Sequence, residues 1–374
     1  MQVSWHLIAN EQQLNELVAS CQGMQAIALD TEFVRTRTYH PRLGLVQLAT
    51  EQDIYLIDPL AIDDLTPLNT LLANPKLCKV MHACNEDLEL FYLLFNQMPN
   101  HVWDTQIAAS HLGQGSSMGL ARLLAAQFDV TLSKEQTQSD WCARPLTQAQ
   151  LDYAALDVAY LLPIYQRQQA QLAQRQSWVV EDSQYQMLSA MPTDPYQAYM
   201  RVRAAAHLRG AKLWLFQQLL AWRETLAREK DLPRGFIIKD PVALNIALKM
   251  PGHKAALAAC GDLPHWLLKH HSASLLQLVE QAKQPGLVPP AAIPGPLNAE
   301  QNQQYQALKR YILAQAKGHG IPEVCLLRRK LLEQLLQMPN PAQAWLQHPY
   351  FYGWRKSIIG QGMAGIFNTE ISSL

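Results

Sequence analysis

The sequence lacks the features that would place the chain in a membrane or in an oxidising compartment. No run of about 18 consecutive apolar residues is present, so we expect no membrane-spanning helix. The N-terminal residues have neither a basic segment nor an apolar core, and we expect no secretory signal. The six cysteines are scattered without a Cys-x-x-Cys pair. This argues against a zinc site or a disulfide framework and favours a cytoplasmic location.

Charge is also scarce, and it is unevenly distributed. Only 17% of the 374 residues are charged while 49% are hydrophobic, so we expect a globular chain of two or three domains. Residues 1–165 contain 18 acidic and 8 basic side chains, a net charge of −10, whereas residues 201–374 contain 10 and 21, a net charge of +11. The basic half is expected to meet a polyanion. Ordinary variation between domain surfaces is the alternative.

The first part of the chain alternates between two hydrophobic periods. Short apolar runs predict strands, and apolar residues at three- and four-residue spacing predict helices. The predicted strands are 3–8, 26–30, 43–49, 54–58 and 79–83, and the predicted helices are 11–21, 65–73, 86–95, 119–128 and 148–165. Short gaps between neighbouring strands favour antiparallel pairing. The pattern predicts an α/β domain with a mixed sheet, followed by an all-helical region.

The helical region repeats itself. Leu308 and Tyr311 follow Leu219 and Trp222 by 89 residues, and an Ile-Pro pair follows a Leu-Pro pair by the same interval. A period of this length predicts two copies of a small helical domain rather than a solenoid, whose units are shorter. A segment rich in proline lies between the copies and is expected to be a linker.

Four acidic residues stand where predicted elements begin or end. Asp30 and Glu32 end the strand 26–30 and should project from one face, roughly 6–7 Å apart. Asp87 lies in the first turn of a helix, and Asp157 follows Tyr153 by one turn of another. Two divalent cations would neutralise such carboxylates and clamp a phosphodiester. For the first pair, solvated acids at a strand end are the alternative.

The motifs around these acids resemble the exonuclease motifs of the DEDD superfamily. They are Asp30-x-Glu32, residues 82–88 and residues 153–157. Tyr153, four residues before Asp157, is typical of the tyrosine-bearing branch. Residues 139–146 are similar to the bacterial ribonuclease D family. The repeated helical part resembles the helicase-and-RNase-D C-terminal (HRDC) module, with a divergent second copy.

The resemblance implies a ribonuclease H-like fold and a metal-dependent 3′–5′ exoribonuclease. Such an enzyme trims tRNA precursors and other small structured RNAs and releases nucleoside 5′-monophosphates. Asp30, Glu32, Asp87 and Asp157 would hold two Mg²⁺ or Mn²⁺ ions. Tyr153 would position the attacking water, since a phenol with a pKa near 10 is a poor base at neutral pH. A monomer is expected.

The resemblance also predicts the order of the domains. We expect an exonuclease domain over 1–170, a connector over 171–203, a first HRDC-like domain over 204–284, a Pro-rich linker over 285–296 and a second, divergent HRDC-like domain over 297–374.

Five further residues are candidate substrate contacts: Phe33, Gln47, His82, Lys134 and Arg144. Phe33 could stack on a base or belong to the core, and Gln47 could reach the terminal nucleotide or bond to backbone. His82 could contact substrate or be a core histidine. Lys134 and Arg144 could bind phosphates or be surface charges. Asp104 is expected to cap a helix rather than to bind metal.

Two other functions remain open. A 3′–5′ exonuclease acting on DNA would use the same four acids, because they contact only the phosphodiester. Recognition of the 2′-hydroxyl would distinguish RNA from DNA as the substrate, and the flanking motifs favour RNA. An inactive nucleic-acid-binding scaffold is the third possibility, but it should have lost some of the acids, and all four are present together with Tyr153.

Overall fold

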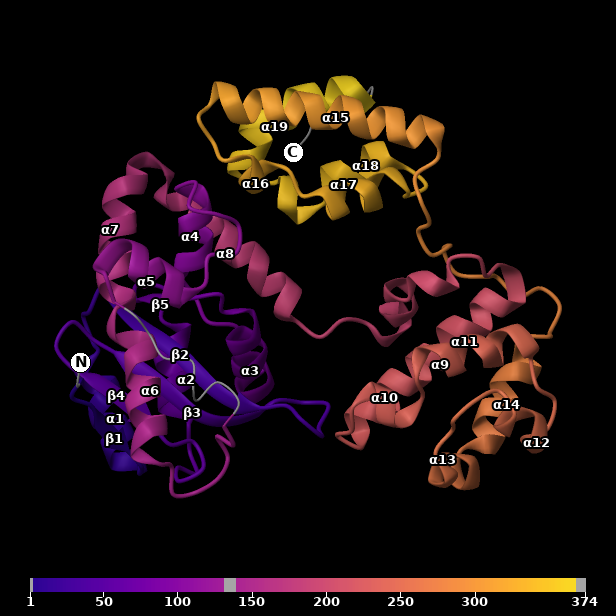
Figure 1. Ribbon diagram of the computed structural model, residues 1–374, viewed down its shortest axis with the longest axis horizontal. Helices are drawn as coiled ribbons and strands as arrows, with labels where there is room; N and C mark the ends of the chain where they lie inside the picture. The colour runs from indigo at the N-terminus through magenta and orange to yellow at the C-terminus, as the bar shows by residue number, and fades with distance from the viewer. Residues whose placement is uncertain (1–2, 131–138, 368–374) are drawn as a thin grey trace. The chain divides into compact units, whose positions relative to one another are not determined.

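The computed structural model describes residues 3–130 and 139–367 (Figure 1). The chain divides into two compact units. The first unit comprises residues 1–34, 42–191 and 299–374, and the second comprises residues 35–41 and 192–298. In the described ranges, no helix has both the length and the apolar character needed to cross a bilayer.

The first unit is built on a six-stranded mixed sheet with the strand order β1-β4-β3-β2-β5-β6. The strands are β1 (His6–Ile8), β2 (Ala26–Val34), β3 (Arg42–Ala49), β4 (Ile54–Ile57), β5 (Cys78–Met81) and β6 (Val102–Asp104). The pairs of β3 with β2 and β4 are antiparallel and the other pairs are parallel. The predicted mixed sheet is confirmed. The three-residue strand β6 was missed, because a run this short has no period to detect.

Helices cover both faces of this sheet. One face packs against α1 (Glu11–Ser20), α2 (Thr66–Ala73) and α3 (Asn85–Phe95). The other face packs against α4 (Thr105–His111), α5 (Leu120–Phe128), α6 (Gln148–Ala159) and α7 (Leu161–Leu172). Along β2, Ile27 and Leu29 face the first layer and Ala28 faces the second, as the two-residue period of a strand requires.

Helix α6 lies over β2, β3 and β4 (Figure 1). Its close approach is possible because Ala154 and Ala155 are small, and both are fully buried. The predicted helix 148–165 is interrupted at Tyr160, after which the chain continues as α7 and the 3₁₀ helix η1 (Ala173–Arg175). The predicted connector 171–203 also differs, because it contains the 15-residue helix α8 (Gln176–Ala190).

A C-terminal helical bundle completes the first unit. It consists of α15 (Ala299–Gly318), α16 (Glu323–Leu326), α17 (Arg329–Leu336), α18 (Pro341–Gln347), the 3₁₀ helix η4 (Pro349–Phe351) and α19 (Trp354–Phe367). The bundle packs on α8 and α4, where Trp354 stacks on Trp178 with ring centroids 4.5 Å apart. Two carbonyls at the end of α15 accept hydrogen bonds of 2.9 Å from Arg175.

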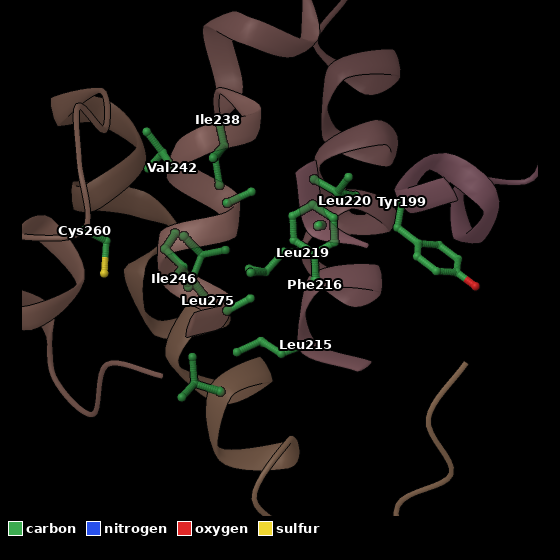
Figure 2. Packing of buried hydrophobic residues seen from close by; sticks show 14 of the residues in the cluster. Tyr199, Leu215, Phe216, Leu219, Leu220, Ile238, Val242, Ile246, Cys260 and Leu275 are labelled. Atoms are coloured by element: carbon green, nitrogen blue, oxygen red, sulfur yellow. The ribbon is translucent and has the colours of Figure 1, made fainter. Parts of the chain in front are cut away.

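The second unit is helical throughout its described elements. They are the 3₁₀ helices η2 (Pro195–Arg201) and η3 (Arg203–Ala205) and the α-helices α9 (Gly210–Glu229), α10 (Arg234–Ile237), α11 (Asp240–Lys249), α12 (Lys254–Ala258), α13 (His265–His270) and α14 (Ser272–Gln281). Figure 2 shows the core, in which Phe216 and Leu219 of α9 meet Ile246 of α11. Apolar spacing along α9 and α11 therefore accounts for the packing of the unit.

The helix bounds support the internal repeat. Helices α15 and α16 begin and end 89 residues after α9 and α10, respectively, and α17 begins 89 residues after α11. The helix bounds therefore have the same period of 89 residues as the sequence repeat.

Residues 35–41 belong to the second unit through Tyr39. Its hydroxyl donates a hydrogen bond to Glu224, and Arg234 lies over its ring at 4.6 Å. Arg228 and Arg234 also form ion pairs with Glu224. Burial would raise the pKa of Glu224, but the bonds from Arg234 and Tyr39 lower that pKa to about 2. Both arginines therefore have a structural role, because each forms an ion pair with the same glutamate.

Candidate active site

Strand β2 carries the first two acids in its middle and second half, beside β3 and under α6, because the strand continues to Val34 and does not end at Asp30 as predicted. Asp30 is opposite Gln47 and Glu32 is opposite Leu45 in the antiparallel register. Directly opposed residues share a face, so Asp30, Glu32 and Gln47 lie on the side of the sheet that α6 covers. The prediction that the two carboxylates share one face is confirmed.

Helix α3 carries the third acid. Asp87 is 7% exposed and lies in the first turn, where a carboxylate is favoured by the helix dipole. The Thr31 hydroxyl, between the two acids of β2, donates a hydrogen bond to the Asp87 carboxylate. This bond links β2 to α3. Sequence reasoning missed Thr31, and its only signal was its position between two acids.

Asp104 caps α4, as predicted, and it also holds the turn that leads into α3. One oxygen of Asp104 accepts hydrogen bonds from the backbone N–H groups of Ala83 and Gln106, at 3.0 and 2.8 Å. Ala83 has a φ of 54°, a left-handed conformation that costs a non-glycine residue energy. Asp104 is fully buried, and its oxygens are used to hold this turn and to cap α4.

Helix α6 carries the fourth acid and the tyrosine. The helix begins with a capping box in which Thr147 and Gln150 bond to each other's backbone. One turn later the Tyr153 hydroxyl donates a hydrogen bond to Asp157. Because residues four apart share a helix face, both side chains are directed toward the sheet that carries Asp30 and Glu32.

The four carboxyl groups interact electrostatically. Burial, followed by the charges of Asp87, Asp157 and Glu32, raises the pKa of Asp30 well above its usual value. Burial and the neighbouring acids raise the pKa of Glu32 to about 9. Burial raises the pKa of Asp87 to about 6 and that of Asp157 to about 7. The four carboxyl groups are therefore close enough for the charge of one to raise the pKa of another.

The chemistry of this site fits a divalent cation. In the described ranges, no three His, Cys, Asp or Glu side chains form a ready-made metal cluster. The fit lies in the donors, which are carboxylate oxygens of the kind that Mg²⁺ and Mn²⁺ prefer, from one buried and three half-buried side chains. A cation among them would remove the repulsion that raises their pKa values.

Arg144 requires a correction. It was predicted as a phosphate contact, but its Nε and Nη2 atoms donate to the carboxylate of Asp58 at 2.7 and 2.6 Å. Its Nη2 atom also donates to the carbonyl of Gly44, and its Nη1 atom to the carbonyl of Trp141. These donors are therefore directed into the protein, and Arg144 anchors the segment before α6 to β3 and β4.

Gly44 explains why that segment can lie so close to β3. A Cβ atom at this position would meet the Trp141 carbonyl oxygen at 2.5 Å and its Cβ at 2.7 Å. Only glycine permits this approach. The bulge between Glu32 and Phe33 occurs opposite the same residue, and a bulge redirects the side chain that follows it.

The other candidate contacts lie in different surroundings. Phe33 is half-buried and lies outside the hydrophobic clusters of the described residues. Gln47 is fully buried, and neither of its side-chain polar atoms has a hydrogen-bond partner among the described residues. His82 bonds to Thr105 at 2.8 Å through Nδ1, and burial lowers its pKa. Lys134 lies outside the described residues.

The sheet and its acids define a 3′–5′ exonuclease domain, and comparison with known proteins agrees. A family model described as 3′-5′ exonuclease matches residues 5–173, and a model of the HRDC domain matches residues 212–279. Ribonuclease D of Pseudomonas paraeruginosa is 36% identical over 90% of both chains. Ribonuclease D of Escherichia coli is 35% identical over 96% of this chain and 98% of its own.

A solved structure extends the similarity to three dimensions. The crystal structure of Escherichia coli RNase D, described as an exoribonuclease involved in structured RNA processing, aligns with a TM-score of 0.87. The alignment covers 98% of this chain and 99% of that chain at 33% identity. The chain belongs to the ribonuclease D family. It is a 3′–5′ exoribonuclease with a metal-dependent exonuclease domain and a nucleic-acid-binding HRDC domain. RNA is therefore the substrate class, and the DNA exonuclease and inactive scaffold alternatives are set aside.

Proposed function

We propose that Asp30, Glu32, Asp87 and Asp157 together hold two divalent cations, Mg²⁺ or Mn²⁺, at the terminal phosphodiester of RNA. The observation that carries this proposal is the electrostatic interaction of four carboxylates from β2, α3 and α6, of which Asp87 is buried and the other three are half-buried. Buried acids of like charge need a positive partner to ionise together. When bound, such cations stabilise the charge that develops on the phosphoryl oxygens and make water more acidic.

The chain's own residues would hold and orient the reactants. Water adds to the phosphorus of the last phosphodiester and the P–O3′ bond breaks. A nucleoside 5′-monophosphate leaves, and the shortened RNA ends in a 3′-hydroxyl. Burial, followed by the neighbouring carboxylates, raises the pKa of Tyr153 above its usual value. Tyr153 therefore stays protonated, and its role is to position water rather than to remove a proton.

Phe33 and Gln47 are the proposed contacts of the terminal nucleotide. Phe33 follows Glu32 directly and belongs to no described hydrophobic cluster, which leaves its ring available for stacking on a base. Gln47 is adjacent to Asp30 and has an unpaired amide. His82 remains a weaker candidate, because its Nδ1 is already bonded to Thr105.

The natural substrates that we propose are tRNA precursors and other small structured RNAs with single-stranded 3′ ends. The support is the similar Escherichia coli RNase D, which is an exoribonuclease involved in structured RNA processing. We further propose the domain boundaries given above, a cytoplasmic location in keeping with six free cysteines, and a monomer, since one chain carries two helical modules.

Time-resolved digestion of matched RNA and DNA oligomers, labelled at the 5′ end, tests the proposal. With Mg²⁺ or Mn²⁺, the RNA should shorten one nucleotide at a time and release 5′-monophosphates, and chelation should stop the reaction. Products cut internally, or nucleoside diphosphates formed in the presence of phosphate, would contradict it.

A further inference from the structure

A second polar site lies in the first unit, next to the acids but separate from them. It is a cavity of about 500 Å³ lined by the start of α3, by α4 and α8, and by α16 and α19 of the C-terminal bundle. The residues that matter for its chemistry are Asn85, His111, Asp182, Gln186, Arg328 and Arg355. None of the four acids of the candidate active site lines it, although Asn85 is only two residues before Asp87.

The negative charge in this cavity is already neutralised. Asp182 is the single acid among the described lining residues, and it is 5% exposed. Its oxygens accept hydrogen bonds from both terminal nitrogens of Arg355 and from His111 Nε2 at 2.9 Å. A buried carboxylate that is bound at two points by an arginine is neutralised, so it attracts a second cation only weakly. Any further positive charge in the cavity is therefore available to a ligand.

Arg328 supplies that further charge. Its guanidinium carbon lies 5.3 Å from the ring centroid of Tyr185 and 4.9 Å from that of Tyr350. No acidic side chain among the described residues forms an ion pair with Arg328. Two aromatic rings hold the guanidinium, and no described residue accepts a hydrogen bond from its N–H groups, so they can bind a phosphate at two points.

Two side chains that line the same cavity, Gln186 and His111, each have a buried polar atom without a partner among the described residues. These atoms are Gln186 Oε1 and His111 Nδ1. His111 is 3% exposed, and its Nε2 faces the Asp182 carboxylate and so carries the proton. Buried polar atoms without partners are costly, and a ligand hydroxyl, which both donates and accepts, would satisfy either of them once the side chain turns toward the cavity.

A ribose phosphate has this combination of groups. Its phosphate matches the cationic fork of Arg328, and its 2′-hydroxyl is a donor for Gln186 or His111. The 2′-hydroxyl is also the group that distinguishes RNA from DNA. We propose that this cavity is an RNA subsite that holds one ribose-phosphate unit of the single strand, upstream of the nucleotide being removed. The inference deepens the proposed function and rests on it for the direction of the strand.

Equilibrium binding tests the subsite without any cleavage. A single-stranded RNA labelled at the 5′ end is titrated with the full chain in the presence of a chelator, and fluorescence anisotropy is recorded at several salt concentrations. Arg328→Ala and Arg328→Lys are compared with Arg329→Ala. Arg329 is the matched control, because it is adjacent, is 77% exposed and pairs with Glu333 at 2.7 Å.

We expect Arg328→Ala to weaken binding about tenfold and to lower the salt slope by about 0.7, the value for one phosphate of a single strand. Arg328→Lys should recover the salt slope but not the full affinity, because lysine lacks the planar fork. Arg329→Ala should bind like the parent chain. Equal losses in Arg328→Ala and Arg329→Ala would overturn the assignment. Circular dichroism of each variant excludes loss of the fold.

A second series tests recognition of the ribose. In RNAs with one 2′-deoxynucleotide at each position in turn, binding to the parent chain should fall about fivefold at one position only. Gln186→Leu should remove part or all of that difference. Uniform binding of every RNA in the series would overturn the proposal. Asp30→Asn should give the same binding results, so failure of the subsite and failure of the proposed catalysis can be told apart.

Discussion

Asp30 and Gln47 are paired across the antiparallel strands β2 and β3, on the face that α6 covers. Asp30 has a strongly raised pKa, and Gln47 is fully buried with both of its amide atoms unpaired among the described residues. A buried amide without partners is destabilising by about 1–3 kcal/mol. Its position beside the central carboxylate indicates that it is retained for a function of the loaded site.

Replacing Gln47 should therefore raise stability and lower activity. Gln47→Leu removes the unpaired amide at similar volume, and we expect it to raise the free energy of unfolding of the metal-free chain by about 1 kcal/mol. The same variant should bind the 3′ end of RNA more weakly and turn over more slowly. Denaturant unfolding would measure the first effect, and RNA titration with single-turnover cleavage would measure the second.

Gln168 provides the matched control. It is also fully buried, but its amide bonds to Trp103 and to the carbonyl of Thr105. Gln168→Leu leaves those partners unsatisfied and should lower stability by about 1–3 kcal/mol. If both substitutions destabilised the chain equally, the special position of Gln47 would be refuted.

The metal-free chain should become less stable as pH rises. The carboxyls of Asp87, Asp157 and Glu32 have pKa values of about 6, 7 and 9, above the values near 4 of an unfolded chain. A raised carboxyl pKa means that the folded chain binds more protons than the unfolded chain. Its contribution to stability is present at low pH and is lost as pH rises through the folded pKa, by about 1.4 kcal/mol per pH unit and proton.

Melting temperatures between pH 5 and pH 9, measured with and without Mg²⁺, would show this. We expect the melting temperature without metal to decline across the range, and Mg²⁺ to restore more stability at pH 8 than at pH 6. Calorimetry in two buffers should also detect proton release on metal binding. A metal-free chain whose stability rose over this range would contradict the shared site.

Tyr153 should affect turnover but not metal binding. Tyr153→Phe removes the hydroxyl that donates to Asp157 and, in our proposal, positions water. Loss of one such hydrogen bond should slow single-turnover cleavage about tenfold to a hundredfold. Tyr165→Phe is the control, since the Tyr165 hydroxyl bonds to Gln169 away from the site. Equal rates for Tyr153→Phe and the parent chain would remove Tyr153 from the mechanism.

The ion pair of Arg355 with Asp182 should stabilise the packing of the C-terminal bundle on α8. The two side chains are 3% and 6% exposed. Arg355→Ala leaves a buried carboxylate without its partner, so we expect a loss of about 3–5 kcal/mol in denaturant unfolding. Arg329→Ala, which breaks an exposed pair, should change stability by less than about 0.5 kcal/mol. Similar small losses in both variants would show that the bundle does not depend on this contact.

Sequence patterns predicted the parts of the site that depend on local geometry. The two-residue period placed Asp30 and Glu32 on one face, and the four-residue spacing placed Tyr153 beside Asp157. The role of Asp104 was also predictable, because a capping residue acts on the next turn of chain. Each of these relationships lies within one element or at its end.

Relationships across the sheet were not predictable. The strand order brings Thr31 to Asp87 and Arg144 to Asp58, which are 56 and 86 residues apart. A single sequence gives no sign of such pairs, so Arg144 was mistaken for a phosphate contact. Helix α8 was missed for a different reason, since its buried positions include polar residues such as Asp182 and Ser183, which form no apolar stripe.

The most direct test of the account is single-turnover digestion of a 3′-extended tRNA by Asp30→Asn at several Mg²⁺ concentrations. The substitution keeps the shape of the side chain and removes one metal-binding charge, which should lower the cleavage rate by about 10³-fold or more. RNA binding by the same variant should be largely unchanged. A cleavage rate equal to that of the parent chain would contradict the claim that these carboxylates carry out the reaction.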